Sequence, residues 1–95
     1  MSQTTVFKGT ARHIVQDGAG KHFYYHATKI VSVRVNGTII LNSGGWRTAT
    51  TKTAMNQASR QDALGLRVWQ EKGEWFVNFK NQSIPFEDGM VLQRN

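Results

Sequence analysis

The sequence predicts an α+β domain, with an antiparallel sheet of about five to seven strands and one helix, over about residues 51–63, packed on one face. Three observations predict this class. Short segments of alternating apolar and polar residues, separated by turn signals, occupy most of the chain. One stretch alone has its apolar residues at helical spacing. The chain has 95 residues, too few to divide into two domains, so residues 1–95 are expected to form a single domain.

Strand patterns fill the first half of the chain. Residues 16–21 are polar and predict a turn, and Asn36-Gly37 predicts a type I′ hairpin turn with positive φ at both positions. Apolar or alternating segments around these turns predict strands at Val6-Phe7 and at residues 13–15, 23–25, 30–35 and 38–41.

The helix follows a glycine-containing loop. A narrow stripe of small apolar residues, Ala54, Met55 and Ala58, is suited to close packing on a sheet, and Gly65 is expected in the C′ region where the helix ends. Lys52, Asn56 and Arg60 are spaced four apart and therefore share another face. This face either extends a binding surface, which we favour, or is the solvated side of the helix.

Strand patterns resume after Gly65. Pro85 cannot donate a ladder hydrogen bond, which places its strand at a sheet edge or a bulge. The segments that predict strands here are residues 66–69, 74–79, 83–86 and 90–92.

Positive charge is confined to one part of the chain. The net charge is +6, but residues 1–60 hold eight lysines and arginines against Asp17 alone, whereas residues 61–95 hold four against five acidic residues. Such a field attracts anionic ligands and polyanions, although basic surfaces also serve solubility alone.

The basic part contains the most informative segment, which joins two glycines, a tryptophan, an arginine, several hydroxyls and a lysine just before the helix. Glycines allow positive φ and expose backbone amides, and a helix start carries amides without intrahelical partners and partial positive charge. A phosphate group is therefore the expected ligand. The predicted ligand-binding residues are Ser43, Gly44, Gly45, Trp46, Arg47, Thr48, Thr50, Thr51, Lys52, Asn56 and Arg60.

Two simpler interpretations compete with this site. Thr50 or Thr51 can cap the helix without any ligand, although capping needs one hydroxyl and no arginine. Trp46 either stacks on a nucleotide base beside Arg47 or forms a lid over the helix end.

Catalytic and metal-binding patterns are not found. The chain has no cysteine, its few acidic residues fall at turns, and Ser43 lacks the nucleophile-elbow spacing, so we expect no enzyme and no cofactor. His13, His22 and His26 lack a nearby carboxylate cluster, so we expect no metal site. The N-terminus does not resemble a signal peptide and no stretch approaches membrane-spanning length, which predicts a cytoplasmic protein.

The segment LNSGGWRTATTKTAMNQ at residues 41–57, together with KGEWFV at residues 72–77, resembles a family of small tailed-bacteriophage proteins. The resemblance covers roughly residues 25–92. The first twenty residues resemble no protein family. The family has no settled activity, so the resemblance implies a phage setting, and with it the host-cell cytoplasm, but little chemistry.

Two classes of function remain, and a third leaves no signature. We expect a non-enzymatic binder of a phosphate-bearing nucleotide, of the kind that phages use as a sponge against nucleotide-signalled immunity. A domain this small can hardly enclose a ligand alone, so we expect a homo-oligomer. The alternative is a nucleic-acid-binding protein that uses the basic face of residues 1–60. An inhibitor that docks on a host protein is the third possibility.

Overall fold

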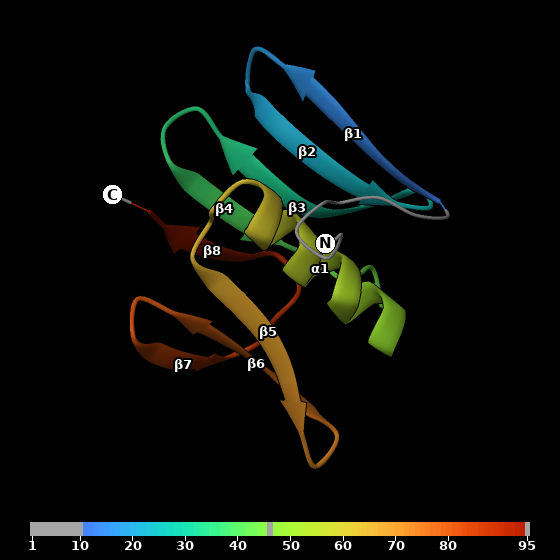
Figure 1. Ribbon diagram of the computed structural model, residues 1–95, viewed down its shortest axis with the longest axis vertical. Coiled ribbons are helices and arrows are strands. Elements are labelled where there is room, and N and C mark those ends of the chain that lie inside the picture. The colour runs from blue at the N-terminus through green and yellow to red at the C-terminus, as the bar shows by residue number, and fades with distance from the viewer. Residues whose placement is uncertain (1–10, 46, 95) are drawn as a thin grey trace, which may run out of the picture.

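The computed structural model describes residues 11–45 and 47–94, which form eight strands and one helix. One antiparallel sheet has the order β1-β2-β3-β4-β8, and a second has the order β5-β6-β7 (Figure 1). The first contains β1 (Arg12–Asp17), β2 (Gly20–Tyr25), β3 (Thr28–Arg34), β4 (Thr38–Leu41) and β8 (Met90–Gln93). The second contains β5 (Leu66–Glu71), β6 (Glu74–Phe79) and β7 (Gln82–Pro85), and the helix is α1 (Ala49–Gln61).

The predicted α+β class is confirmed, but the strands form two sheets instead of one. The strand predicted at Val6-Phe7 lies outside the described residues. The predicted turn type at Asn36-Gly37 was wrong. Among the described residues only Gly37 of this pair has positive φ, at 91°, and its amide donates to the Arg34 carbonyl over 3.0 Å. The hairpin therefore uses a three-residue loop that ends in a left-handed glycine, a common alternative to the two-residue turn.

The core fills the space between the two sheets and α1. Phe23 pairs with Val31, and Val31 with Leu41, so these three fully buried side chains form one row across β2, β3 and β4. The helix contributes its apolar stripe, whose three residues are also fully buried. In Figure 1, α1 lies between the five-stranded sheet and the three-stranded sheet. The predicted packing face of the helix is confirmed.

The helix begins two residues earlier than predicted. Thr48 has extended backbone angles and its hydroxyl accepts the Thr51 amide over 3.3 Å, which makes Thr48 the N-cap. Thr50 and Thr51, the expected caps, lie inside the first turn.

The helix also ends two residues earlier than predicted. Asp62 is the C-cap, and Ala63 follows with a φ of 52°. The Leu64 amide donates back to the Ser59 carbonyl over 2.9 Å, as in a Schellman motif. Alanine thus occupies the left-handed position that the sequence analysis assigned to Gly65, because Gly65 is used in the connection to β5 instead.

Side chains of α1 cover the outer edge of β5. The Asn56 carboxamide accepts the Val68 amide over 2.7 Å and donates to the Val68 carbonyl over 3.0 Å. Ser59, one turn further along, makes the same pair of bonds to Leu66, at 3.2 and 2.7 Å. The helix therefore takes the hydrogen-bonding positions that a neighbouring strand would otherwise fill.

Asn56→Ala is expected to lower the free energy of unfolding by about 1–3 kcal/mol, because both polar groups of Val68 lose their partner. Urea denaturation measures this. Thr53→Ala, an exposed threonine on the same helix, is the control and is expected to change stability by less than about 0.5 kcal/mol. Equal losses in the two variants would show that the Asn56 bonds add nothing.

Ala63→Gly is expected to raise the free energy of unfolding by about 0.5–1 kcal/mol, because glycine adopts positive φ without the Cβ clash that alanine suffers. Gly65 also has positive φ, at 76°, so Gly65→Ala is the opposite control and is expected to destabilise. An unchanged or lower midpoint for Ala63→Gly would contradict this account of the helix end.

Candidate functional site

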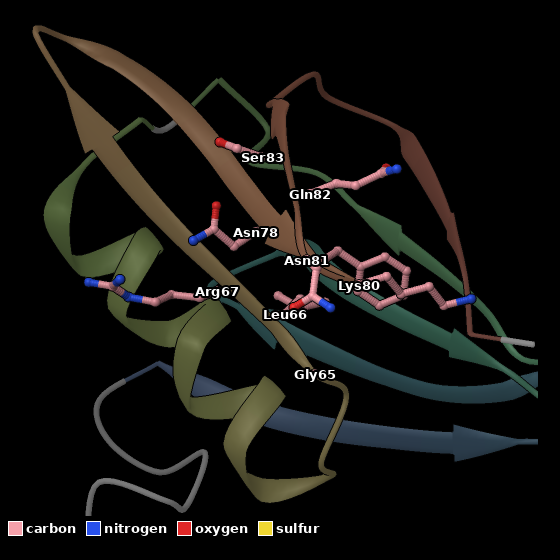
Figure 2. A pocket seen from close by; sticks show the side chains of 9 residues that line it. Gly65, Leu66, Arg67, Asn78, Lys80, Asn81, Gln82 and Ser83 are labelled. Carbon is pink, nitrogen blue, oxygen red and sulfur yellow. The ribbon is translucent and has the colours of Figure 1, made fainter.

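Two hollows of similar size occur in the described part of the chain. One, of about 580 Å³, lies at the end of the three-stranded sheet where β6 turns into β7 (Figure 2). No predicted ligand-binding residue lines it. The other, of about 600 Å³, lies between the β2–β3 turn and the first turn of α1. It is lined by Tyr25, His26, Ala27, Thr28, Thr48, Thr50 and Thr51. We call it the α1 hollow.

The β2–β3 turn supplies the aromatic wall of the α1 hollow. His26 has a φ of 57°, and its amide donates to the Ala11 carbonyl over 2.8 Å, which fixes the tight turn. The Tyr25 and His26 rings are in tilted contact, with centroids 4.4 Å apart. The Arg12 guanidinium lies 5.4 Å from the centroid of the Tyr25 ring. Tyr25 and His26 therefore border the hollow, and a cation lies against the Tyr25 ring.

The helix supplies the polar wall. Thr48 and Thr51 have their hydroxyls 3.1 Å apart, and the Thr48 hydroxyl also caps the Thr51 amide. The first intrahelical bond runs from the Lys52 amide to the Thr48 carbonyl. Helix geometry gives the amides of Ala49 and Thr50 no intrahelical acceptor, so the partial positive charge of this end lies beside the hollow. The exposed Thr50 hydroxyl lies on the same wall.

The glycine loop is closed by its own side chains. Gly44 and Gly45 both have positive φ, at 63° and 85°, as glycines in such a loop require. The Gly44 amide donates to the Asn42 carboxamide oxygen over 2.8 Å, and the Gly45 amide donates to the Ser43 hydroxyl over 3.2 Å. These two amides, which the sequence analysis expected to face a phosphate, already have acceptors in the fold.

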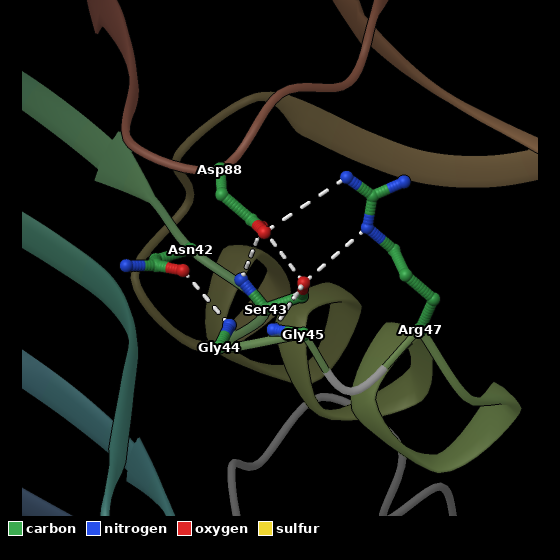
Figure 3. A network of polar contacts seen from close by, with 6 residues as sticks. All are labelled: Asn42, Ser43, Gly44, Gly45, Arg47 and Asp88. Carbon is green, nitrogen blue, oxygen red and sulfur yellow. Dashed lines mark hydrogen bonds and ion pairs between the residues drawn. The ribbon is translucent and has the colours of Figure 1, made fainter.

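Ser43 is fully buried and joins the loop to the β7–β8 connection. Its amide and its hydroxyl both donate to one carboxylate oxygen of Asp88, over 2.8 and 2.7 Å. Arg47 Nε donates to the Ser43 hydroxyl over 3.3 Å, and the guanidinium lies 4.0 Å from the other Asp88 oxygen. Figure 3 shows Asp88 and Arg47 both reaching the Ser43 hydroxyl.

This network favours the charged form of the Asp88 side chain. Partial burial alone would raise the pKa of Asp88, but the two bonds from Ser43 and the nearby Arg47 guanidinium outweigh it and lower the pKa below its ordinary value. The Arg47 guanidinium also lies over Phe86, 4.8 Å from the ring centroid. Arg47 is therefore bound within the fold and does not line the α1 hollow.

The structure divides the predicted ligand-binding residues into groups. Three threonines line the α1 hollow, whereas Ser43, the glycines and Arg47 belong to the Asp88 network. Lys52 and Asn56 face β5: the Lys52 ammonium donates to the Gln70 side chain over 3.1 Å, and Asn56 bonds to Val68. Arg60 is exposed on the last turn of α1, and Trp46 lies outside the described residues.

Sequence reasoning missed the aromatic wall. Tyr25 was interpreted as a strand residue, and His26 was considered as a metal ligand; in the structure Tyr25 ends β2 and His26 begins the turn. The left-handed φ of His26 was the feature that placed both rings beside the helix. Histidine is one of the residue types enriched at positive φ, but positive φ is uncommon for any residue other than glycine, so the residue type alone did not mark this turn.

An Asp17–His22–Ser32 chain of hydrogen bonds resembles a catalytic triad only in its residue types. His22 lies 3.2 Å from the Asp17 carboxylate and 2.7 Å from the Ser32 hydroxyl. Ser32 is only 4% exposed, and it lines none of the hollows found in the described part. A substrate carbonyl has no route to this hydroxyl. These hydrogen bonds therefore serve to tie β2 to β3.

In residues 11–45 and 47–94, no three histidine, aspartate or glutamate side chains gather closely enough to hold a metal ion. The helix of the described chain is neither long enough nor apolar enough to cross a bilayer.

Comparison with known proteins assigns the chain to a family. The model of the Kyanoviridae Gp96 protein family matches residues 2–93, which is nearly the whole chain. This protein belongs to the Kyanoviridae Gp96 family. The tailed-phage setting expected from the sequence is thereby confirmed, although the match does not single out the glycine–tryptophan loop. No curated protein and no solved structure matches the chain.

In this Gp96-family protein, Asp88→Ala is expected to lower the free energy of unfolding by about 1–3 kcal/mol, because the buried Ser43 amide and hydroxyl lose their acceptor. Asp88→Asn keeps an acceptor oxygen and is expected to cost less. Glu87→Ala, at the exposed neighbouring position, is the control. An equal loss in Glu87→Ala would show that the bonds to Ser43 add nothing.

The same network predicts a pH dependence. Because the folded pKa of Asp88 is lowered, its stabilisation is complete above the ordinary aspartate pKa of about 4 and is lost as the pH falls through the folded value. The stability difference between wild type and Asp88→Asn should therefore be constant near neutrality and shrink below about pH 4. A difference that stays constant into strong acid would contradict the network.

Proposed function

We propose that this phage protein is a non-enzymatic binding protein that captures a phosphate-bearing nucleotide in the α1 hollow. The observation that carries the proposal is the composition of that hollow, in which two aromatic rings face the hydroxyl-lined start of a helix across about 600 Å³. A volume of this order suits a small organic ligand. A base has rings to stack on, and a phosphate has hydroxyls and helix-end amides to bind.

The proposal places the ligand differently from the sequence-based prediction. The Gly44 and Gly45 amides and Arg47 are engaged within the fold, so the glycine loop acts as the support that fixes where α1 begins. The phosphate contacts come from Thr48, Thr50 and the first-turn amides.

The distribution of the cations favours a compact ligand over nucleic acid. Three of the eight cations in residues 1–60 are directed at the second half of the chain: Lys21 to Asp62 at 3.0 Å, Arg47 towards Asp88, and Lys52 to Gln70. The basic excess of the sequence is thus partly used in holding the domain together. A continuous phosphate-binding stripe would need those cations to point at phosphates instead of at these partners.

In a phage setting, a nucleotide binder without a catalytic centre acts by sequestration, and we propose a sponge for a nucleotide signal of host immunity. Because the α1 hollow opens to one side of a small domain, we propose that the working form is a homo-oligomer.

The test is a calorimetric titration with nucleoside mono-, di- and triphosphates, cyclic nucleotides and inorganic phosphate. Single- and double-stranded oligonucleotides are titrated separately, at low and high salt. One or a few small nucleotides should bind with modest salt dependence and a fixed ratio to subunits. Tight oligonucleotide binding that falls steeply with salt, without small-nucleotide binding, would establish the nucleic-acid alternative instead. If neither the small nucleotides nor the oligonucleotides bind, both the nucleotide-binding and the nucleic-acid-binding functions are excluded, and a host protein is the indicated target.

For the nucleotide that binds, Thr50→Val should weaken affinity about tenfold or more, because a hydrogen bond to a charged phosphate contributes about 1.5–3 kcal/mol. Thr53→Val makes the same chemical change on the same helix outside the hollow and should bind as wild type does. Thermal melts check that both variants fold. Equal nucleotide affinity of the two variants would show that the α1 hollow is not the binding site.

A further inference from the structure

The outer face of the three-stranded sheet carries three ordered rows of side chains. Strand register places Glu71 opposite Glu74, Trp69 opposite Phe76 and Arg67 opposite Asn78, and side chains two apart on a strand share a face. β7 extends the middle row with Pro85 and the last row with Ser83. The face therefore has an acidic end, an apolar centre and a basic, polar end.

The apolar centre is ordered and partly open. The Trp69 and Phe76 rings are stacked with centroids 4.8 Å apart, and the Trp69 indole N–H donates to the Asn78 side chain over 2.8 Å. Both rings are half-buried, and Pro85 beside them is exposed. The single polar atom of Trp69 already has its acceptor, so a flat contact on these rings would leave no donor unpaired.

The two ends of the face have opposite charge. Glu71 and Glu74 are exposed and directly opposite each other, an arrangement of like charges that is unfavourable in an isolated sheet. At the other end, the hollow of about 580 Å³ shown in Figure 2 is lined by Arg67 and Lys80 together with uncharged residues, polar and apolar, and it has no acidic lining residue. In the described part of the chain, no ion pair engages Arg67, Glu71 or Glu74.

We propose that this face binds a second copy of the chain in a two-fold, face-to-face dimer. The acidic and basic rows lie on either side of the aromatic row, each about 7 Å from it along the strands. A two-fold axis that runs along the aromatic row places Trp69 and Phe76 of one copy against Trp69 and Phe76 of the other. The same operation lays the acidic hairpin end of each copy over the basic hollow of the other, so Arg67 lies opposite Glu71 of the second copy.

Charge complementarity selects this occupant. A polyanion would meet the Glu71–Glu74 pair on the face that holds Arg67, and an acidic protein would meet the same repulsion. The face measures about 14 by 20 Å from strand spacing and rise, or roughly 300 Å² per copy, which is small for a stable interface. The dimer is therefore weak and concentration-dependent. The proposal stands on a different surface from the α1 hollow and does not need its ligand.

The experiment is analytical ultracentrifugation without nucleotide, from about 10 μM to about 1 mM, a range that spans weak association. Wild type should form a dimer within this range, and less of it at high salt, where exposed charge pairs are screened. Arg67→Glu and Glu71→Arg, each of which places like charges across the interface, should each raise the dissociation constant at least tenfold. Lys29→Glu, an exposed charge reversal on β3, should dimerise as wild type does.

An equimolar mixture of Arg67→Glu and Glu71→Arg provides the decisive measurement. In the mixed pair, the glutamate introduced in one variant faces the arginine introduced in the other, and the second contact keeps its native Arg67 and Glu71, so dimers should return. A damaged fold would not be repaired by mixing, and circular dichroism melts monitor folding separately. The proposal is overturned if wild type stays monomeric to the top of the range, if the single variants dimerise normally, or if the mixture associates no better than its components.

Discussion

The contact between α1 and the outer edge of β5 is the constraint on which the rest of the structure depends. Asn56 and Ser59 bond to alternate residues of β5, so the helix is held at one distance and one register against the three-stranded sheet. The buried stripe of the same helix packs in the core between the sheets. Because both faces are fixed, the start of α1 has one position relative to the β2–β3 turn, and the α1 hollow results from that position.

The Ser43–Asp88 network fixes the other end of the same arrangement. Between β4 and α1 the chain must reverse through two left-handed glycines, a backbone path that would be loose without support. Asp88, from the β7–β8 connection, binds the buried Ser43 from outside the loop, and Ser43 and Asn42 then bind the glycine amides from inside it. A carboxylate that accepts two bonds and faces a guanidinium is more rigid than a neutral acceptor would be. The loop that resembled a phosphate cradle is thus filled by a carboxylate of the protein itself.

Local features were predictable from the sequence, and their assembly was not. Alternation and turn residues located the described strands to within a few residues, and the stripe of Ala54, Met55 and Ala58 located the packing face of the helix. The division into two sheets depends on Asn56 and Ser59 bonding to a strand edge, and no sequence period encodes such a bond. The partner of Ser43 lies 45 residues away, so loop composition alone could not show that the glycine amides were engaged. For the candidate site, the threonines were found from the helix start, whereas Tyr25 and His26 were missed because their placement depends on a strained turn.

The separation of charge along the sequence has a structural explanation that the net charge alone does not show. Lys21 and Arg47, from the basic part, face the carboxylates of Asp62 and Asp88 in the other part, and Lys52 donates to the neutral side chain of Gln70, so part of the asymmetry is attraction between the two parts of one domain. The acidic residues that remain at the β5–β6 turn lie on the same sheet face as Arg67, two rows away. A face that carries both signs in separate rows repels a uniform polyanion and is complementary to its own inverted copy. The sequence asymmetry that first indicates nucleic acid is therefore explained in part by contacts within the domain, and the dimer and the anion site that we propose assign roles to the charges that remain.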